Sequence, residues 1–131
     1  MRTKVQYEYA VIRFVPRVER EEFLNVGVIL FSKTEKYIGM RYLVDESRVR
    51  ALCPDADIEL LQTALAAFQA TAYGENLNTP IGKWDTIDRF RWLTANRSSI
   101  LQTSPVHPGI CPKGELETTL NSLFLKLAPC P

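Results

Sequence analysis

The sequence has few cysteines, a single histidine, no long hydrophobic run and almost no net charge. Its three cysteines, at positions 53, 111 and 130, lie far apart, so a disulfide framework is not expected. No apolar run approaches the roughly 20 residues that span a bilayer. Alternating polar and apolar residues follow the basic N-terminus, whereas a signal peptide would continue with an apolar stretch. These absences predict an intracellular, cytoplasmic protein without a membrane segment.

The charge balance gives no support to one class of partner. The formal net charge is +1, from 16 basic and 15 acidic side chains, which gives no electrostatic reason to expect nucleic acid or an anionic membrane as the main partner. The hydrophobic fraction of 46% and the charged fraction of 24% are ordinary for a globular protein. We therefore expect one domain over residues 1–131.

Three runs in the first 44 residues have the composition of β-strands. They cover residues 5–15, 23–31 and 37–44, and the first is rich in β-branched and aromatic residues. In the first run, the odd-numbered residues from Val5 to Arg13 share one face. The second run is apolar on both faces, which is typical of a central strand covered on both sides. Because the connections are short, we expect an antiparallel three-stranded meander.

Helical spacing follows, and then strand-like patterns return. Asp45 can cap a short helix that ends near residue 52, and Asp55 or Asp57 can cap a second helix that continues to residue 72. After a loop over 74–82, alternation at 89–94 predicts a fourth strand and residues 99–103 a fifth. The prolines at 105, 108 and 112 predict an irregular stretch, and leucines at 116, 120, 123 and 127 predict a last amphipathic helix. The fold class is thus α+β: a mostly antiparallel sheet of about four or five strands, opening with a meander and packed against two or three helices.

Polar residues gather around the first predicted hairpin. Arg13 precedes the connection, Glu22 and Asn25 follow it, and Gly27 lies inside the second strand, where glycine costs stability unless something approaches the backbone or the strand bends. In one interpretation, Arg13, Glu22 and Asn25 bind an anionic or peptide ligand. Arg13 then pairs with Glu22 or stacks on aromatic rings, since it shares its predicted face with Tyr7 and Tyr9. In the structural alternative, an ion pair and the Asn25 side chain hold the connection in place.

A second candidate region runs from Arg89 to Gln102. Arginines alternate with aromatic residues in Arg89-Phe90-Arg91-Trp92, as in grooves that bind single-stranded nucleic acid, but any half-buried strand shows the same alternation. The polar loop at 96–99 is able to cradle an anion with its hydroxyls and amides, although such a turn needs no ligand to form.

His107 is the only histidine, so a catalytic Ser–His or Cys–His pair would have to use it with Ser104 or Cys111. No Gly-x-Ser-x-Gly elbow accompanies these residues. A zinc site from His107 and the three cysteines would have suitable ligands but lacks the paired short spacings of known sites. We expect no catalytic residue, no metal site and no cofactor.

Two long segments resemble a known family. Residues 9–16 and 20–31, with the run Glu-Phe-x-Asn-Val-Gly-Val-x-Leu-Phe, look like the opening of a bacterial domain-of-unknown-function family (number 3037). Residues 89–94 and 97–107 resemble its second signature. The resemblance implies a site list drawn from matching motif positions: Arg13, Glu22, Asn25, Gly27, Arg97, Ser98, Gln102 and His107. It also suggests a small accessory subunit of a HipA-like kinase.

Three functions remain open from the sequence. The leading hypothesis is a non-enzymatic domain that binds a protein partner, such as a kinase, through the first hairpin and residues 94–107. The second is a small enzyme that acts on a phosphorylated or nucleotide substrate with Arg13, Arg97, Glu22 and His107. The third is a single-stranded nucleic-acid binder that uses Arg89, Arg91 and Trp92.

Overall fold

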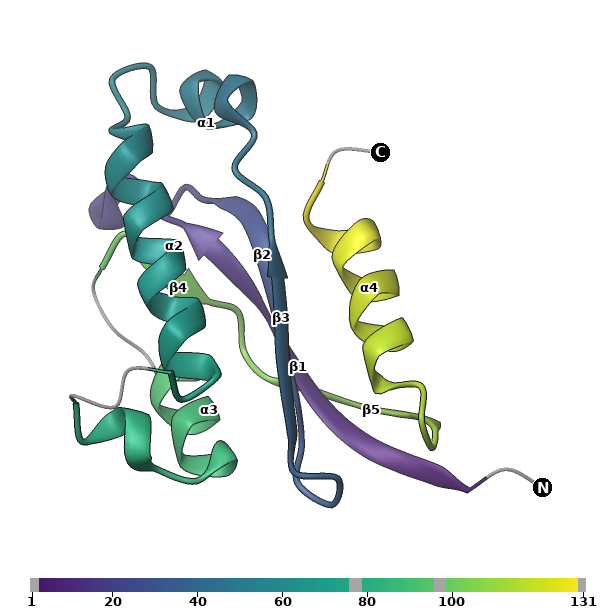
Figure 1. Ribbon diagram of the computed structural model, residues 1–131. Helices are drawn as coiled ribbons and strands as arrows, with labels where there is room; N and C mark the ends of the chain where they lie inside the picture. The colour runs from purple at the N-terminus through teal and green to yellow at the C-terminus, as the bar shows by residue number, and fades with distance from the viewer. Residues whose placement is uncertain (1–2, 76–78, 96–98, 130–131) are drawn as a thin grey trace.

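The computed structural model describes residues 3–75, 79–95 and 99–129. Within these residues the chain forms five strands and four α-helices (Figure 1). The strands are β1 (Lys4–Phe14), β2 (Leu24–Ser32), β3 (Tyr37–Tyr42), β4 (Leu101–Thr103) and β5 (His107–Pro112). The helices are α1 (Glu46–Leu52), α2 (Ile58–Ala72), α3 (Thr86–Thr94) and α4 (Leu116–Leu127). None of these helices is both long enough and apolar enough to cross a membrane.

One antiparallel sheet organises the molecule, and its order is β3-β2-β1-β4, with β5 also paired to β1. The strand β1 is long enough to pair with β4 along its C-terminal end and with β5 along its N-terminal part. The predicted meander of the first three strands and the α+β class are confirmed. The central strand β2 is buried at every position from Val26 to Ser32, as its uninterrupted apolar run predicts.

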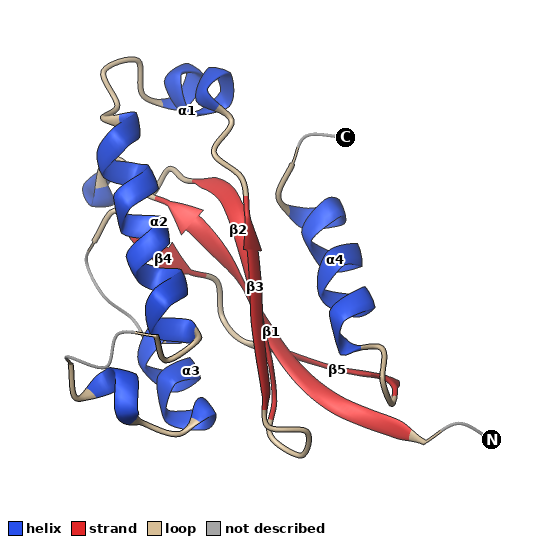
Figure 2. Ribbon diagram, in the orientation of Figure 1, coloured by secondary structure: helices blue, strands red, loops and turns tan. Residues whose placement is uncertain are grey.

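Helices cover the two faces of the sheet unequally. Figure 2 shows α2 and α3 on one side of the sheet and α4 on the other. On the first side, Ile12 and Phe31 of the sheet pack with Leu61 of α2 and Phe90 of α3. The second side has a smaller core in which Leu120 of α4 packs against the sheet. The other buried members of this core are Val5, Val28, Leu30, Cys111 and Leu116.

The predicted fourth strand is wrong, because the segment from Thr86 to Thr94 is helix α3. Phe90 and Leu93, three residues apart, are the buried residues of this helix, and that spacing places both on one helical face. The alternation of arginines with Phe90 and Trp92 is therefore a short coincidence within a helical sequence.

The irregular stretch predicted around the prolines is also wrong, because residues 107–112 form the edge strand β5. The backbone N–H of Lys113 donates to the Thr3 carbonyl at 2.8 Å, so the odd-numbered residues of β5 direct their N–H groups towards β1. Pro108 and Pro112 occupy outward positions, where a missing N–H breaks no bond within the sheet. The prolines thus close this edge to further strand pairing.

Candidate functional site

Three residues of the predicted site lie side by side across the sheet. Arg13 of β1 is paired with Asn25 of β2 on one side and with Gln102 of β4 on the other. Directly opposed residues of antiparallel strands place their side chains on the same face. We call Asn25, Arg13 and Gln102 the polar row. It lies on the α4 side, because Arg13 shares its face of β1 with Tyr7 and Tyr9, which pack into the α4 core.

A bulge sets the position of the row. The register between β1 and β2 shifts between Ile12 and Arg13, so that Asn25, and not Val26, lies opposite Arg13. One extra residue in a strand redirects the side chains beyond it. Without this bulge, Asn25 would point to the other face.

Asn25 holds the end of helix α4. Its amide nitrogen Nδ2 donates to the Leu127 carbonyl at 3.1 Å, and Arg48 Nη1 donates to the next carbonyl, that of Ala128, at 2.8 Å. The last carbonyls of a helix lack partners within the helix, so these two bonds stabilise its C-terminus. Because a carbonyl only accepts, the amide orientation is fixed, and Asn25 Oδ1 remains as a buried acceptor without a hydrogen-bond partner in the described chain.

Arg13 has a buried hydrogen-bond donor, whereas Asn25 has a buried acceptor. Its Nε is buried and donates no hydrogen bond to any described residue, and its guanidinium lies over the Phe23 ring, 4.0 Å from the ring centroid. Phe23 is 45% exposed. Glu22 pairs with Arg20 and not with Arg13, and Arg13 stacks on Phe23 and not on the rings of Tyr7 and Tyr9 from which stacking was expected.

Of the other predicted site residues, His107 lies apart from the row. His107 is exposed at the edge strand β5, opposite Tyr9, with the two ring centroids 5.3 Å apart. It shares the face of the row but lies about 13 Å from Arg13 along the strand direction. Gln102 Nε2 donates to the Ser99 carbonyl at 3.3 Å. Arg97 and Ser98 are outside the described residues.

Gly27 allows the approach of a neighbouring strand. A Cβ at this buried position would lie 2.6 Å from the Arg41 carbonyl oxygen and 2.9 Å from Tyr42 Cβ, both in β3. Gly27 is paired with Ile12, which faces the core of α2 and α3. Its role is thus in strand packing, and it does not border the polar row.

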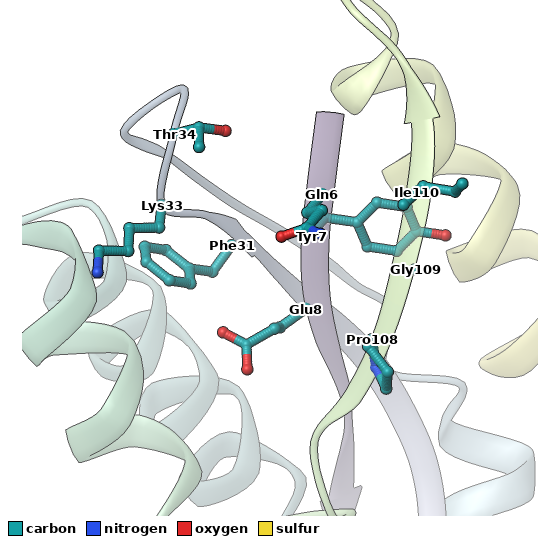
Figure 3. A pocket seen from close by; sticks show the side chains of 9 residues that line it. All are labelled: Gln6, Tyr7, Glu8, Phe31, Lys33, Thr34, Pro108, Gly109 and Ile110. Carbon is teal, nitrogen blue, oxygen red and sulfur yellow. The ribbon is translucent and has the colours of Figure 1, made fainter. Parts of the chain in front are cut away.

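A groove that sequence reasoning missed lies on the opposite face of the sheet. It has a volume of about 520 Å³ and lies between the turn after β2 and the strand β5 (Figure 3). Glu8 borders it and accepts from Arg91 Nη2 of α3 at 3.0 and 3.2 Å. None of the predicted site residues lines this groove, and the sequence offered no signal for it because β5 was expected to be irregular. The lining residues are Gln6, Tyr7, Glu8, Phe31, Lys33, Thr34, Pro108, Gly109 and Ile110.

Comparison with family models shows to which family the chain belongs. The model of a protein of unknown function, DUF3037, matches residues 9–128. The chain belongs to the DUF3037 family. A comparison with curated proteins finds no match, and a comparison with solved structures finds none either. The matched range of this DUF3037 chain includes the whole polar row and helix α4.

Ser104 was considered for a catalytic pair with His107 in this DUF3037 chain, and its hydroxyl has other partners. Ser104 is buried, and its hydroxyl accepts from the Val11 N–H at 2.9 Å and donates to the Pro105 carbonyl at 2.9 Å, so it is committed to the backbone. Glu22 lines a cavity of about 340 Å³ that neither Arg13 nor His107 borders. The described residues include no group of three His, Cys, Asp or Glu side chains arranged to hold a metal ion.

Cys53 is a poor nucleophile in this setting. It lines a cavity of about 340 Å³ with Arg17, Arg20 and Glu22, and its thiol donates to Asp55 Oδ1 at 3.2 Å. This hydrogen bond raises the pKa of the Cys53 thiol and lowers the pKa of the Asp55 carboxyl. The thiolate is the reactive form of cysteine, and here the thiol is favoured.

The arginines proposed to bind nucleic acid have partners inside the DUF3037 chain. Arg89 Nε donates to the Ala72 carbonyl at 3.2 Å, and Arg89 Nη1 donates to the Trp84 carbonyl. Arg91 pairs with Glu8. Neither arginine belongs to an alternating strand, so the pattern that suggested a single-strand groove is absent from this helix.

Proposed function

We propose that this DUF3037 chain is a non-enzymatic accessory subunit that binds a protein partner on the α4 side of its sheet. The binding surface consists of the polar row and Phe23. The family resemblance suggests a HipA-like kinase as the partner.

One observation carries this proposal: the guanidinium of Arg13 lies over the ring of Phe23, which is 45% exposed. Arginine and aromatic residues are also the types that dominate binding energy at protein interfaces. A partner that covers Phe23 accounts for a large exposed ring stacked beside an arginine.

The experiment measures binding of the full chain to a HipA-like kinase from the same organism by isothermal titration calorimetry. We expect Arg13→Lys and Phe23→Ala each to weaken binding by about tenfold or more, because each removes a central contact. Arg50→Lys and Leu60→Ala are matched controls, since Arg50 pairs with Glu46 in α1 and Leu60 is exposed on α2. These controls are expected to bind as the unchanged chain does.

Two outcomes count against the proposal. One is equal affinity of all four variants, which would place the interface elsewhere. The other is the recovery of the chain from its native host as a lone monomer, with no kinase or other protein bound in repeated purifications and no binding in calorimetry.

A further inference from the structure

Two tryptophans border an open surface cavity beside helix α3, which lies on the side of the sheet away from α4 and the polar row (Figure 2). The cavity has a volume of about 530 Å³, which is within the range of small-molecule sites. The indole planes of Trp84 and Trp92 meet at 85°, with their centroids 6.1 Å apart. The two residues are 39% and 42% exposed. The chain therefore presents two large aromatic rings to solvent at nearly right angles.

The backbone holds both rings in place. The Trp84 N–H donates to the Ile81 carbonyl at 3.1 Å, and the Trp84 carbonyl accepts from Arg89 Nη1. Trp92 belongs to α3, which is anchored in the core by the fully buried Phe90. A site whose parts are already in position loses less conformational entropy when a ligand binds.

A carboxylate accompanies the two rings. Asp88 lines the same cavity and lies one helical turn before Trp92, so the two side chains are neighbours on α3. Among the described residues, Asp88 has no hydrogen-bond or ion-pair partner. Arg91 also borders the cavity, but it pairs with Glu8 at 3.0 Å. The charge that remains for a ligand is therefore the negative charge of Asp88.

This combination separates the possible ligand chemistries. A quaternary ammonium group is attracted to the faces of aromatic rings, needs no hydrogen-bond acceptor and gains from a nearby carboxylate. A primary ammonium carries three donors, and a guanidinium carries five, whereas the charged acceptor lining this cavity is one carboxylate. The negative charge of Asp88 repels an anion. The cavity is thus best suited to a cation without N–H groups.

We propose that Trp84, Trp92 and Asp88 bind the trimethylammonium group of a small molecule of about the size of choline. The indole faces enclose the methyl groups, and the Asp88 carboxylate compensates the positive charge. This site lies beyond the proposed kinase-binding surface and shares no residue with it. The two assignments therefore succeed or fail independently.

The test uses the tryptophan fluorescence of the full chain. The sequence contains two tryptophans, and both line this cavity, so the signal reports on this site. The first probe is choline, and the second is its neutral isostere dimethylbutanol, in which carbon replaces the nitrogen. Sodium chloride keeps the ionic strength constant. We expect choline to change the fluorescence to saturation and to bind about tenfold more tightly than the isostere, because the two probes differ in charge and not in shape.

Matched variants assign the contacts. Asp88→Asn is expected to weaken choline about threefold to tenfold and to leave dimethylbutanol unchanged. Trp84→Leu is expected to weaken choline about tenfold, with Trp92 as the remaining reporter. Asp85→Asn is the control, because Asp85 is exposed, makes no capping hydrogen bond and does not line the cavity. An acidic residue in the first turn also stabilises a helix, so circular dichroism verifies the helix content of each variant.

A third and a fourth probe identify the source of the ligand. The third is a blocked peptide of trimethyllysine between two glycines, which we expect to bind no more tightly than choline. Binding of this peptide tenfold tighter than choline would assign the site to a modified protein and overturn the small-molecule ligand. The fourth is deoxythymidine monophosphate, and its binding more tightly than choline would show a stacking site for nucleotides.

Three further results would overturn the proposal. Equal affinities of choline and dimethylbutanol would mean that the cavity binds apolar groups without regard to charge. Equal losses in Asp88→Asn and Asp85→Asn would show a general effect of negative charge and no contact with Asp88. The absence of any fluorescence change with choline would show that the two rings do not form a cation site.

Discussion

Tyr7 and Gly109 lie opposite each other in the antiparallel pair of β1 and β5, and the tyrosine ring occupies the space that any side chain at position 109 would need. A Cβ on Gly109 would overlap the ring. The ring in turn packs beside Tyr9, at 6.2 Å between centroids, and contributes to the core beneath α4. The glycine is thus required by the position of one aromatic side chain.

Gly109→Ala is therefore expected to destabilise the fold by about 1–3 kcal/mol, the usual cost of inserting atoms into a packed site. Urea unfolding followed by circular dichroism measures this change in the free energy of unfolding. The same substitution in a Tyr7→Ala background is the control, because the space is then empty and the cost should largely disappear. Equal costs in both backgrounds would contradict the packing argument.

Ser104→Ala tests the connection between β4 and β5. The Ser104 hydroxyl is the partner of the Val11 N–H, so its removal leaves a buried backbone donor unsatisfied, at a cost of about 1–3 kcal/mol. Thermal unfolding compares this variant with Ser122→Ala, which alters an exposed position of α4. A Ser104→Ala protein as stable as the control would show that Val11 finds another partner.

The elements predicted correctly are those whose patterns are long or capped. Asp45 and Asp57 accept from the N–H groups of Arg48 and Leu60, as helix caps do, and the leucine spacing of α4 extends over three turns. The alternation around Phe90 spans too few residues to separate a strand from a helix, and α3 was assigned to the wrong class. The strand β5 was missed because prolines normally interrupt strands, and only its position at the edge explains their presence.

The candidate site was predictable in its residues but not in its arrangement. Arg13 and Asn25 are recognisable as polar side chains in apolar strands, and Gln102 belongs both to the polar region after Arg89 and to the family resemblance. Their alignment depends on a bulge in β2. It also depends on the pairing of β4 with the end of β1, two strands that are more than 70 positions apart in the sequence. His107 lies about 13 Å from Arg13 along the strand direction, and this position depends on which residue of β5 pairs with Tyr9. Long-range register of this kind leaves no local trace in the sequence.

The N-terminal half of α4 is fastened to β3 through one carboxylate. The Tyr37 hydroxyl donates to Glu117 Oε2 at 2.6 Å, and Arg41 pairs with Glu117 Oε1. Tyr37→Phe removes the hydroxyl and is expected to cost up to about 1 kcal/mol at neutral pH, because the bond is exposed to solvent. Arg41 still holds Glu117 in this variant, so the helix remains docked.

The same bond predicts a dependence on pH. Burial, with a smaller contribution from Tyr73, raises the pKa of Tyr37 above its usual value of 10.0, and Arg41 opposes this shift. The neutral hydroxyl is therefore favoured in the folded protein. Its contribution to stability is complete below pH 10 and is lost as the pH rises through the higher pKa of the folded state. The difference in stability between the unchanged protein and Tyr37→Phe should hence shrink above pH 10, and a constant difference would contradict the assignment.

Cys53 provides a prediction about reactivity. Its hydrogen bond to Asp55 raises the pKa of the thiol, and the nearby Arg17 opposes this effect. Asp55→Ala is thus expected to lower the pKa of Cys53 and to speed its alkylation by iodoacetamide at mildly alkaline pH, since the thiolate is the nucleophile. Mass spectrometry of the peptide that contains Cys53 gives the rate across a pH series and separates it from the other cysteines. Glu59→Ala, which removes another carboxylate near the start of α2, should leave the profile unchanged. An Asp55→Ala profile that coincides with that of the unchanged protein would mean that the hydrogen bond does not control the thiol.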